Sequence, residues 1–181
     1  MHRSVLSFLL ILPTLAPAME ARPPKIEQPP PLIPMRDFFR NPEGASYEVS
    51  PGGDYISWLA PWQSRLNVFV QPVDGSGQPR RLTDATERDI AGYFWAAKDQ
   101  IVYLQDDGGD ENFHLYAVNA DGASRRDLTP FPGVRVGVVD DLRDDEDHLL
   151  ISMNKRDARV FDVFRLNTRD GTMKLVAENP G

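Results

Sequence analysis

A unit of about 46 residues recurs along this chain, and this repetition restricts the fold more than any other feature of the sequence. Residues 54–59 (DYISWL) recur 45 positions later as residues 99–104 (DQIVYL). Residues 80–83 (RRLT) recur 46 positions later as residues 126–129 (RDLT), and a more divergent third copy begins at Asp147. Self-similarity at this period is the signature of a repeat architecture.

Each unit has the pattern of four short strands. In the second copy the expected strands are residues 90–96, 100–104, 113–118 and 126–129. Asp-Gly pairs between strands are typical of tight hairpins, and no later stretch shows a sustained helical period. The sequence therefore predicts an all-β fold of about three four-stranded blades of an incomplete β-propeller, at residues 45–85, 88–131 and 133–181. A β-sandwich with coincidental spacing is the alternative, and the repeated Leu-Thr endings argue against it.

The position of each strand within a blade follows from its composition. The first strands are the most apolar and are expected on the inner, buried side, whereas the last strands carry arginine and are expected at the solvent rim. Because a propeller needs about 4–8 blades to close, three blades indicate the N-terminal part of a longer protein, as a truncated product or an incomplete sequence. Oligomerisation that completes the ring is the alternative. An open ring exposes a sheet edge, so self-association is expected.

The first 35 residues have the composition of a targeting segment and a linker. Residues 1–18 combine a short basic start, an apolar core and a small-x-small site at Ala16-Pro17-Ala18, which predicts a signal peptide cleaved after Ala18. An uncleaved anchor is the alternative. Export implies a periplasmic or extracellular protein without membrane association after cleavage. Residues 19–35 are rich in proline and read as an extended spacer, with a polyproline ligand as the alternative.

Charge and cysteine content exclude several classes of function. The whole chain has a formal net charge of −7 and no basic stripe, which excludes nucleic acid as the expected partner. Without cysteine the chain forms neither a disulfide framework nor a thiolate metal site. We therefore expect no cofactor.

The sequence has no recognisable catalytic set. A nucleophile elbow requires Gly-x-Ser-x-Gly, and the nearest match, around Ser76, lacks that spacing. His114 and His148 are the histidines after the signal, and both fall at predicted strands. We therefore predict no catalytic residue and no metal ligand in this chain, and no enzymatic activity of this chain alone.

Two acidic clusters remain as candidates for binding. Residues 140–147 read as a solvated loop and, as the alternative, as a calcium site, although EF-hand spacing is absent. Residues 106–112 read either as a charged hairpin turn or as a ledge of carboxylates that holds a cationic group, such as the free amine of a peptide. Asp110 and Glu111 are the candidate substrate-binding residues.

Three phrases resemble a known family. Residues 50–58 (SPGGDYISW), 107–116 (DGGDENFHLY) and 119–122 (NADG) are similar to the opening of exported bacterial prolyl oligopeptidase family serine peptidases of the dipeptidyl and acylaminoacyl peptidase types. The resemblance implies an N-terminal propeller that gates or contacts peptide substrates, with the catalytic residues in an α/β-hydrolase domain beyond this sequence. The alternatives are a TolB-like propeller that binds periplasmic proteins, and a truncation product that does not fold stably.

Overall fold

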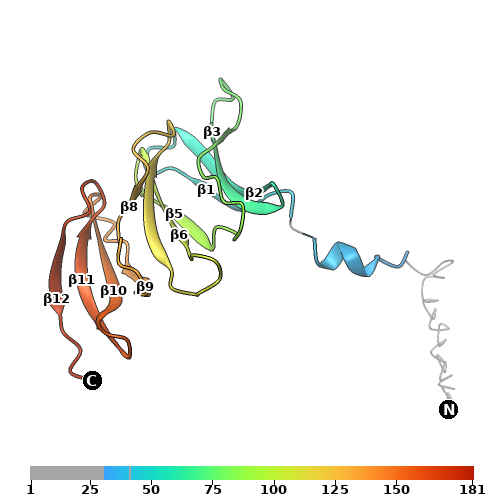
Figure 1. Ribbon diagram of the computed structural model, residues 1–181. Helices are drawn as coiled ribbons and strands as arrows, with labels where there is room; N and C mark the ends of the chain where they lie inside the picture. The colour runs from blue at the N-terminus through green and yellow to red at the C-terminus, as the bar shows by residue number, and fades with distance from the viewer. Residues whose placement is uncertain (1–30, 41) are drawn as a thin grey trace, which may run out of the picture. The chain divides into compact units, whose positions relative to one another are not determined.

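The computed structural model describes residues 31–40 and 42–181 (Figure 1). The chain divides into two compact units, Met1–Phe38 and Phe39–Gly181. The predicted signal peptide, and residues 19–30 of the predicted linker, lie outside the described residues. The described part of the first unit contains a 3-10 helix, η1 (Met35–Phe38), with exposed side chains. No helix in the described ranges is long and apolar enough to cross a membrane.

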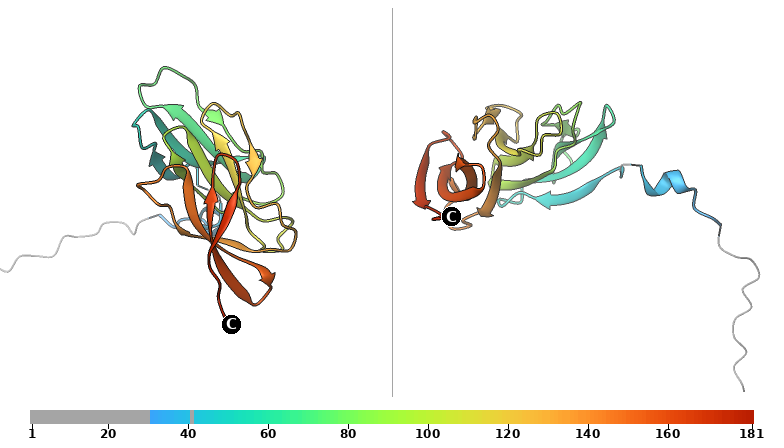
Figure 2. Two further views of the ribbon diagram at one scale, coloured as in Figure 1. Left: turned by 90° about the vertical axis from the view of Figure 1, so that its left-hand side faces the viewer. Right: turned by 60° about the horizontal axis from the view of Figure 1, so that its bottom comes forward.

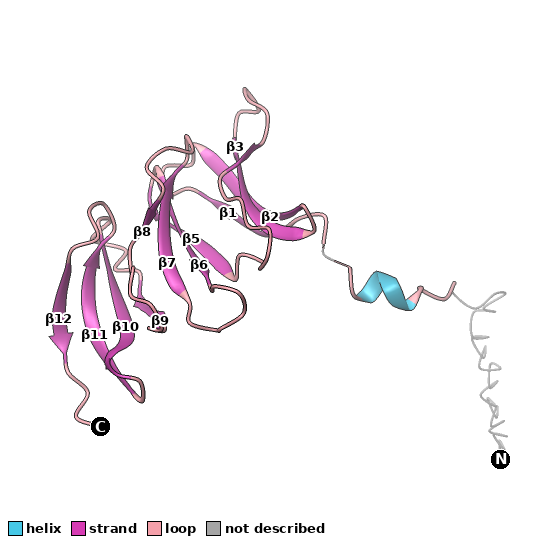
Figure 3. Cartoon of the chain, viewed as in Figure 1, coloured by secondary structure: helices cyan, strands magenta, loops and turns pink. Residues whose placement is uncertain are grey.

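The second unit consists of three four-stranded antiparallel sheets in succession (Figures 1 and 3). Within each sheet, neighbouring strands are consecutive in the chain, so every connection is a hairpin. This confirms the predicted all-β fold of three four-stranded blades, and the sheets of the described residues do not join into a closed ring. The strands of the three blades are β1 (Ala45–Val49), β2 (Tyr55–Trp62), β3 (Arg65–Pro72) and β4 (Arg80–Arg81); β5 (Gly92–Ala97), β6 (Gln100–Gln105), β7 (His114–Asn119) and β8 (Arg126–Asp127); and β9 (Val136–Asp140), β10 (His148–Asp157), β11 (Val160–Asn167) and β12 (Met173–Ala177).

The Asp-Gly pairs form the same turn in every blade, between the third and fourth strands. Asp74, Asp121 and Asp170 each accept a hydrogen bond of 2.8 Å from the backbone N–H two residues later. The glycine that follows each aspartate has φ between 71° and 83°, a region that L side chains rarely adopt. The repeated Asp-Gly therefore fixes the outer hairpin of each blade.

The repeated Leu-Thr ending follows the short fourth strand. Leu82 and Leu128 are buried. Thr83 Oγ1 accepts the Val68 N–H at 2.9 Å, and Thr129 Oγ1 accepts the Leu115 N–H, also at 2.9 Å. The threonine side chain thus continues the ladder where the strand itself stops. This is why β4 and β8 contain two residues each and are shorter than the sequence predicts.

Two apolar clusters hold the three blades together. The first joins blades one and two, and includes Leu59, Val68 and Ile101; the second joins blades two and three, and includes Val102, Leu115 and Ile151. Successive residues of β6 therefore face opposite neighbours, as the period of two in a strand requires. Figure 2 shows the second sheet between the other two.

The first strands differ in burial, which corrects one expectation. In β5 most side chains are buried, but Tyr47 and Val49 of β1 and Val139 of β9 are more than half exposed. The prediction that all first strands are buried is therefore wrong for β1 and β9. The physical reason is that only the second blade has a neighbouring sheet on both faces.

The rim arginines link neighbouring blades. Arg80 and Arg126 lie at equivalent positions of β4 and β8 and are both exposed. The Arg80 guanidinium donates to the backbone carbonyl of Asp121, and the Arg126 guanidinium donates to that of Arg169, so each contacts the outer hairpin of the next blade. The solvent rim therefore also carries inter-blade contacts.

Candidate functional site

The loop between β6 and β7 carries the two predicted substrate-binding residues. Gly108, Gly109 and Glu111 have positive φ values of 58°, 90° and 60°. The Asp110 N–H donates to the Asp107 carbonyl at 3.1 Å, which closes a tight turn. The glycines permit this turn without strain, whereas Glu111 adopts a conformation that is uncommon for a residue with a side chain.

The Asp110 carboxylate is engaged within its own loop. It accepts hydrogen bonds of 3.0 Å from the backbone N–H and from the side-chain amide of Asn112. These bonds, with the side-chain bond as the larger cause, hold the pKa of Asp110 below its usual value. Asp110 therefore carries a negative charge whose oxygens are directed largely to Asn112.

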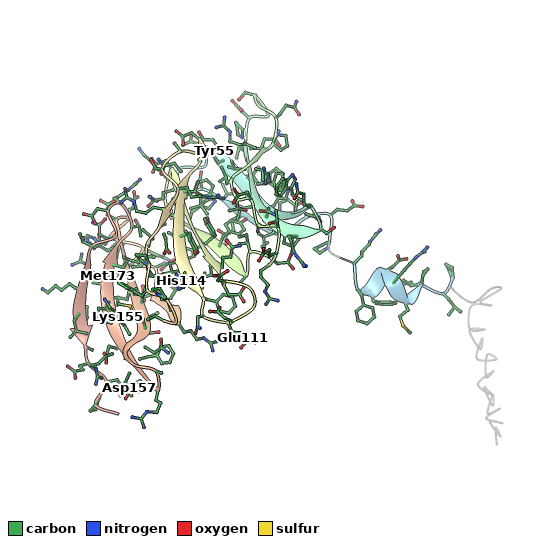
Figure 4. The ribbon with its side chains drawn as sticks, in the orientation of Figure 1. Tyr55, Glu111, His114, Lys155, Asp157 and Met173 are labelled. Atoms are coloured by element: carbon green, nitrogen blue, oxygen red, sulfur yellow. The ribbon has the colours of Figure 1, made fainter. Side chains whose placement is uncertain are left out.

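The Glu111 carboxylate lies at the exposed end of the same loop (Figure 4). Within the described chain this carboxylate forms no ion pair or hydrogen bond, whereas its backbone N–H donates to Asp106 Oδ2 at 3.4 Å. The backbone of Glu111 is therefore fixed by a hydrogen bond to Asp106, whereas its carboxylate is available to a ligand.

An acidic pocket of about 550 Å³ opens beside this loop. His114 Nδ1 lies 3.4 Å from Asp127 Oδ2 on one wall. Four carboxylates line the pocket, and one of them, Asp106, is paired with Arg88. The negative charge of the others can attract a cation such as an ammonium group. The lining residues are Gln105, Asp106, Asp107, Asp110, His114, Tyr116, Asp127, Pro132 and Gly133.

The structure adds Asp127 to the residues that the sequence singled out. Asp110 lines the pocket together with Asp127, and Glu111 is adjacent in the loop but not part of the lining. Asp127 occupies the repeat position that Arg81 holds in the first copy. This exchange of a basic for an acidic residue within an otherwise repeated ending is the signal by which Asp127 could have been found.

The second acidic cluster connects β9 and β10. Asp145 accepts a bond of 2.9 Å from His148 Nδ1 and a second bond from Arg165, and these partners lower the pKa of Asp145. Asp147 pairs with Arg169 at 3.0 Å. The described residues hold no group of three or more side chains arranged to bind a metal ion. Most of the segment is exposed, as the loop interpretation expects.

The histidines and Ser76 do not come together. Ser76 lies in the exposed turn between β3 and β4. His114 and His148 begin β7 and β10, and pair with Asp127 and Asp145 respectively. Neither imidazole bonds to a serine hydroxyl in residues 31–40 and 42–181. The described residues therefore contain no serine that is hydrogen-bonded to a histidine base.

The sequence is similar to two curated peptidases, although no family model matches it. It is 40% identical over 149 residues to dipeptidyl aminopeptidase BIII of Pseudoxanthomonas mexicana, a match that covers 82% of this chain and 22% of the relative. It is 29% identical over 157 residues to dipeptidyl peptidase family member 6 of Caenorhabditis elegans, covering 82% of this chain and 21% of the relative. The chain spans about a fifth of the length of these relatives.

Solved structures share the fold at low sequence identity. An acylaminoacyl peptidase in complex with a chloromethyl ketone matches with a TM-score of 0.52 and 12% identity, over 76% of this chain and 25% of that chain. An oligogalacturonate lyase matches with a TM-score of 0.58 and 8% identity, over 78% of this chain and 44% of that chain. These likenesses show the arrangement of blades, and the sequence relatives show a resemblance to part of a dipeptidyl peptidase.

Proposed function

We propose that this chain, a homologue of part of a dipeptidyl aminopeptidase, supplies three blades of the propeller that gates or contacts peptide substrates in an exported serine peptidase. The observation that carries the proposal is the 40% identity over 149 residues, which covers 82% of this chain. The nucleophile and its partners lie in an α/β-hydrolase domain elsewhere in the full-length protein. The chain itself supplies binding and access.

The acidic pocket of the second blade serves the positive end of the substrate. A dipeptidyl peptidase must distinguish a free amino terminus from an internal peptide, and a carboxylate that pairs with an ammonium group makes this distinction. Asp110 lines this pocket. The Glu111 carboxylate lies in the adjacent loop rather than in the lining, has no partner among the described residues, and supports the same role.

Export places the enzyme in the periplasm or outside the cell. The proposal rests on the pattern of residues 1–18, with cleavage after Ala18. Intact mass of the protein recovered from the periplasm tests it. A mature chain that begins at Met19 supports export, and a chain that retains residues 1–18 in the cytoplasm contradicts it.

Turnover of chromogenic dipeptides tests the enzymatic proposal. The full-length protein should release the chromophore from dipeptide substrates with a free amino terminus, and a serine-directed phosphonate should abolish this release. The 181-residue chain alone should give the background rate, because it lacks the catalytic domain. A full-length protein that hydrolyses no peptide would contradict the proposal and favour a TolB-like propeller that binds proteins.

A further inference from the structure

We propose that Arg88 and Asp106 are positioning residues that hold the β6–β7 loop in the conformation in which Glu111 meets the amino group of a substrate. This inference rests on the proposed function. These two residues need not touch the substrate themselves. The contact between them connects the end of one blade to the binding loop of the next.

Asp106 is a buried charge with few partners. Its side chain is 2% exposed, and it lies 3.3 Å from the Nε of Arg88. Its other oxygen accepts the Glu111 N–H at 3.4 Å. A buried carboxylate is costly unless it is paired and hydrogen-bonded. The same two contacts that satisfy Asp106 therefore tie the loop backbone at Glu111 to Arg88.

Arg88 comes from a connection that is itself firmly held. Asp89 Oδ1 accepts the Leu66 N–H at 2.8 Å, and the N–H of the buried Ile90 donates to the Leu66 carbonyl at 3.0 Å. The residue next to Arg88 is thus fixed to strand β3 of the first blade. The guanidinium has a defined anchor in one blade and reaches the loop of the next.

The loop backbone passes directly beside the guanidinium at Gly109. A Cβ at that position would lie 3.6 Å from the Arg88 guanidinium carbon, and the residue has φ = 90°. The absence of a side chain lets the backbone adopt this conformation next to Arg88. Arg88 therefore contacts the loop through Asp106 and lies close to the loop backbone at Gly109.

Loss of Arg88 should release Glu111. Without the cation, the Asp106 carboxylate is buried without a counter-ion, and water should compete with the Glu111 N–H for its oxygens. Glu111 then leaves its uncommon backbone conformation, and its carboxylate no longer occupies one position. Because binding of a charged group depends on a fixed partner, discrimination between free and blocked amino termini should fall.

The test compares Arg88→Met with Arg88→Lys in the full-length protein. Two quantities are measured: hydrogen exchange of residues 107–113, and the ratio of kcat/KM for a free peptide to that for its N-acetylated form. Arg88→Met should raise the exchange and lower the ratio about tenfold, and Arg88→Lys should restore part of both.

Asp106→Asn is the second, nearly isosteric variant and should act like Arg88→Met. Arg125→Met, which removes the rim ion pair with Asp84, is the matched control and should change neither quantity.

Two outcomes overturn the inference in different ways. Unchanged exchange in both Arg88→Met and Asp106→Asn would show that these residues do not hold the loop. Raised exchange in Arg88→Met, together with an unchanged ratio in Glu111→Gln, would show that the loop is held but does not contact the amine, which traces the failure to the proposed function.

Discussion

The indole nitrogen of Trp95 donates a hydrogen bond of 2.9 Å to the Ser57 hydroxyl, and this bond joins the first and second blades. Ser57 lies on β2 and is fully buried, and Trp95 lies on β5 and is 8% exposed. The Trp95 ring also stacks on Tyr55 of the first blade. The contact thus combines a polar bond with aromatic packing at the boundary between two blades.

Ser57→Ala should destabilise the propeller by about 1–3 kcal/mol, because it leaves the indole N–H buried without a partner. Urea unfolding of the full-length protein, followed by tryptophan fluorescence, measures the change. Ser76→Ala is the control, because Ser76 is exposed in a turn, and it should change stability by less than about 0.5 kcal/mol. Equal effects of the two substitutions would show that the Trp95 bond contributes nothing.

The hydroxyl group of the threonine in the Leu-Thr ending should contribute to the stability of the fold. Thr129→Val keeps the volume and removes the acceptor of the Leu115 N–H, which should cost about 1–3 kcal/mol. Thr129→Ser keeps the acceptor and should cost less, about the 0.8 kcal/mol of one buried methyl group. The midpoint of urea unfolding decides between them. A serine variant that is less stable than the valine variant would contradict this account of the repeat.

Asp162 should make the folding stability of the protein depend on pH in the acidic range. Hydrogen bonds from Arg156, and from the backbone of Asn179, lower the pKa of Asp162 from 3.8 to about 2. Because the folded state binds this proton less tightly than the unfolded state, the stabilisation is complete above about pH 4 and is lost as the pH falls through about 2. Asp162→Asn should therefore be less stable than wild type at pH 6, with a difference that shrinks toward pH 2. Thermal unfolding across this range checks it, and a constant difference would refute it.

Glu111→Gln and Asp110→Asn should have different effects on substrates. Glu111 has no partner for its carboxylate in the described chain, so Glu111→Gln should lower kcat/KM for free peptides about tenfold to a hundredfold, and leave acetylated peptides unchanged. Asp110 is bonded to Asn112, so Asp110→Asn should have a smaller effect on free peptides and also loosen the turn. Steady-state kinetics on matched peptide pairs measures this. Equal losses on free and acetylated peptides would reduce the loop to a structural turn.

The repeat made the architecture predictable, because the Asp-Gly and Leu-Thr anchors mark the same hairpin and the same ladder end in successive copies. The lengths of β4 and β8 were not predictable, since a side chain of Thr83 or Thr129 replaces the backbone in the ladder. The exposure of Tyr47 and Val139 was also missed. Burial of a strand depends on whether a neighbouring sheet covers it, and a local pattern does not contain that information.

The sequence predicted only the part of the candidate site whose residues are close together in the chain. Asp110 and Glu111 follow from a charged, glycine-rich turn within a few residues. The contact between Arg88 and Asp106 joins residues 18 positions apart in two different connections, and no spacing in the sequence indicates it. Asp127 was accessible in principle, through its difference from Arg81 in the repeat.

The most direct test of the central claim is the position of the reactive serine. Labelling the active full-length protein with a serine-directed phosphonate, followed by peptide mass spectrometry, identifies the modified residue. We expect a single labelled serine outside residues 36–181, with loss of dipeptidyl peptidase activity in proportion to labelling. A label on a serine within residues 36–181, or full activity after complete labelling, would contradict the assignment of this chain to the propeller of a serine peptidase.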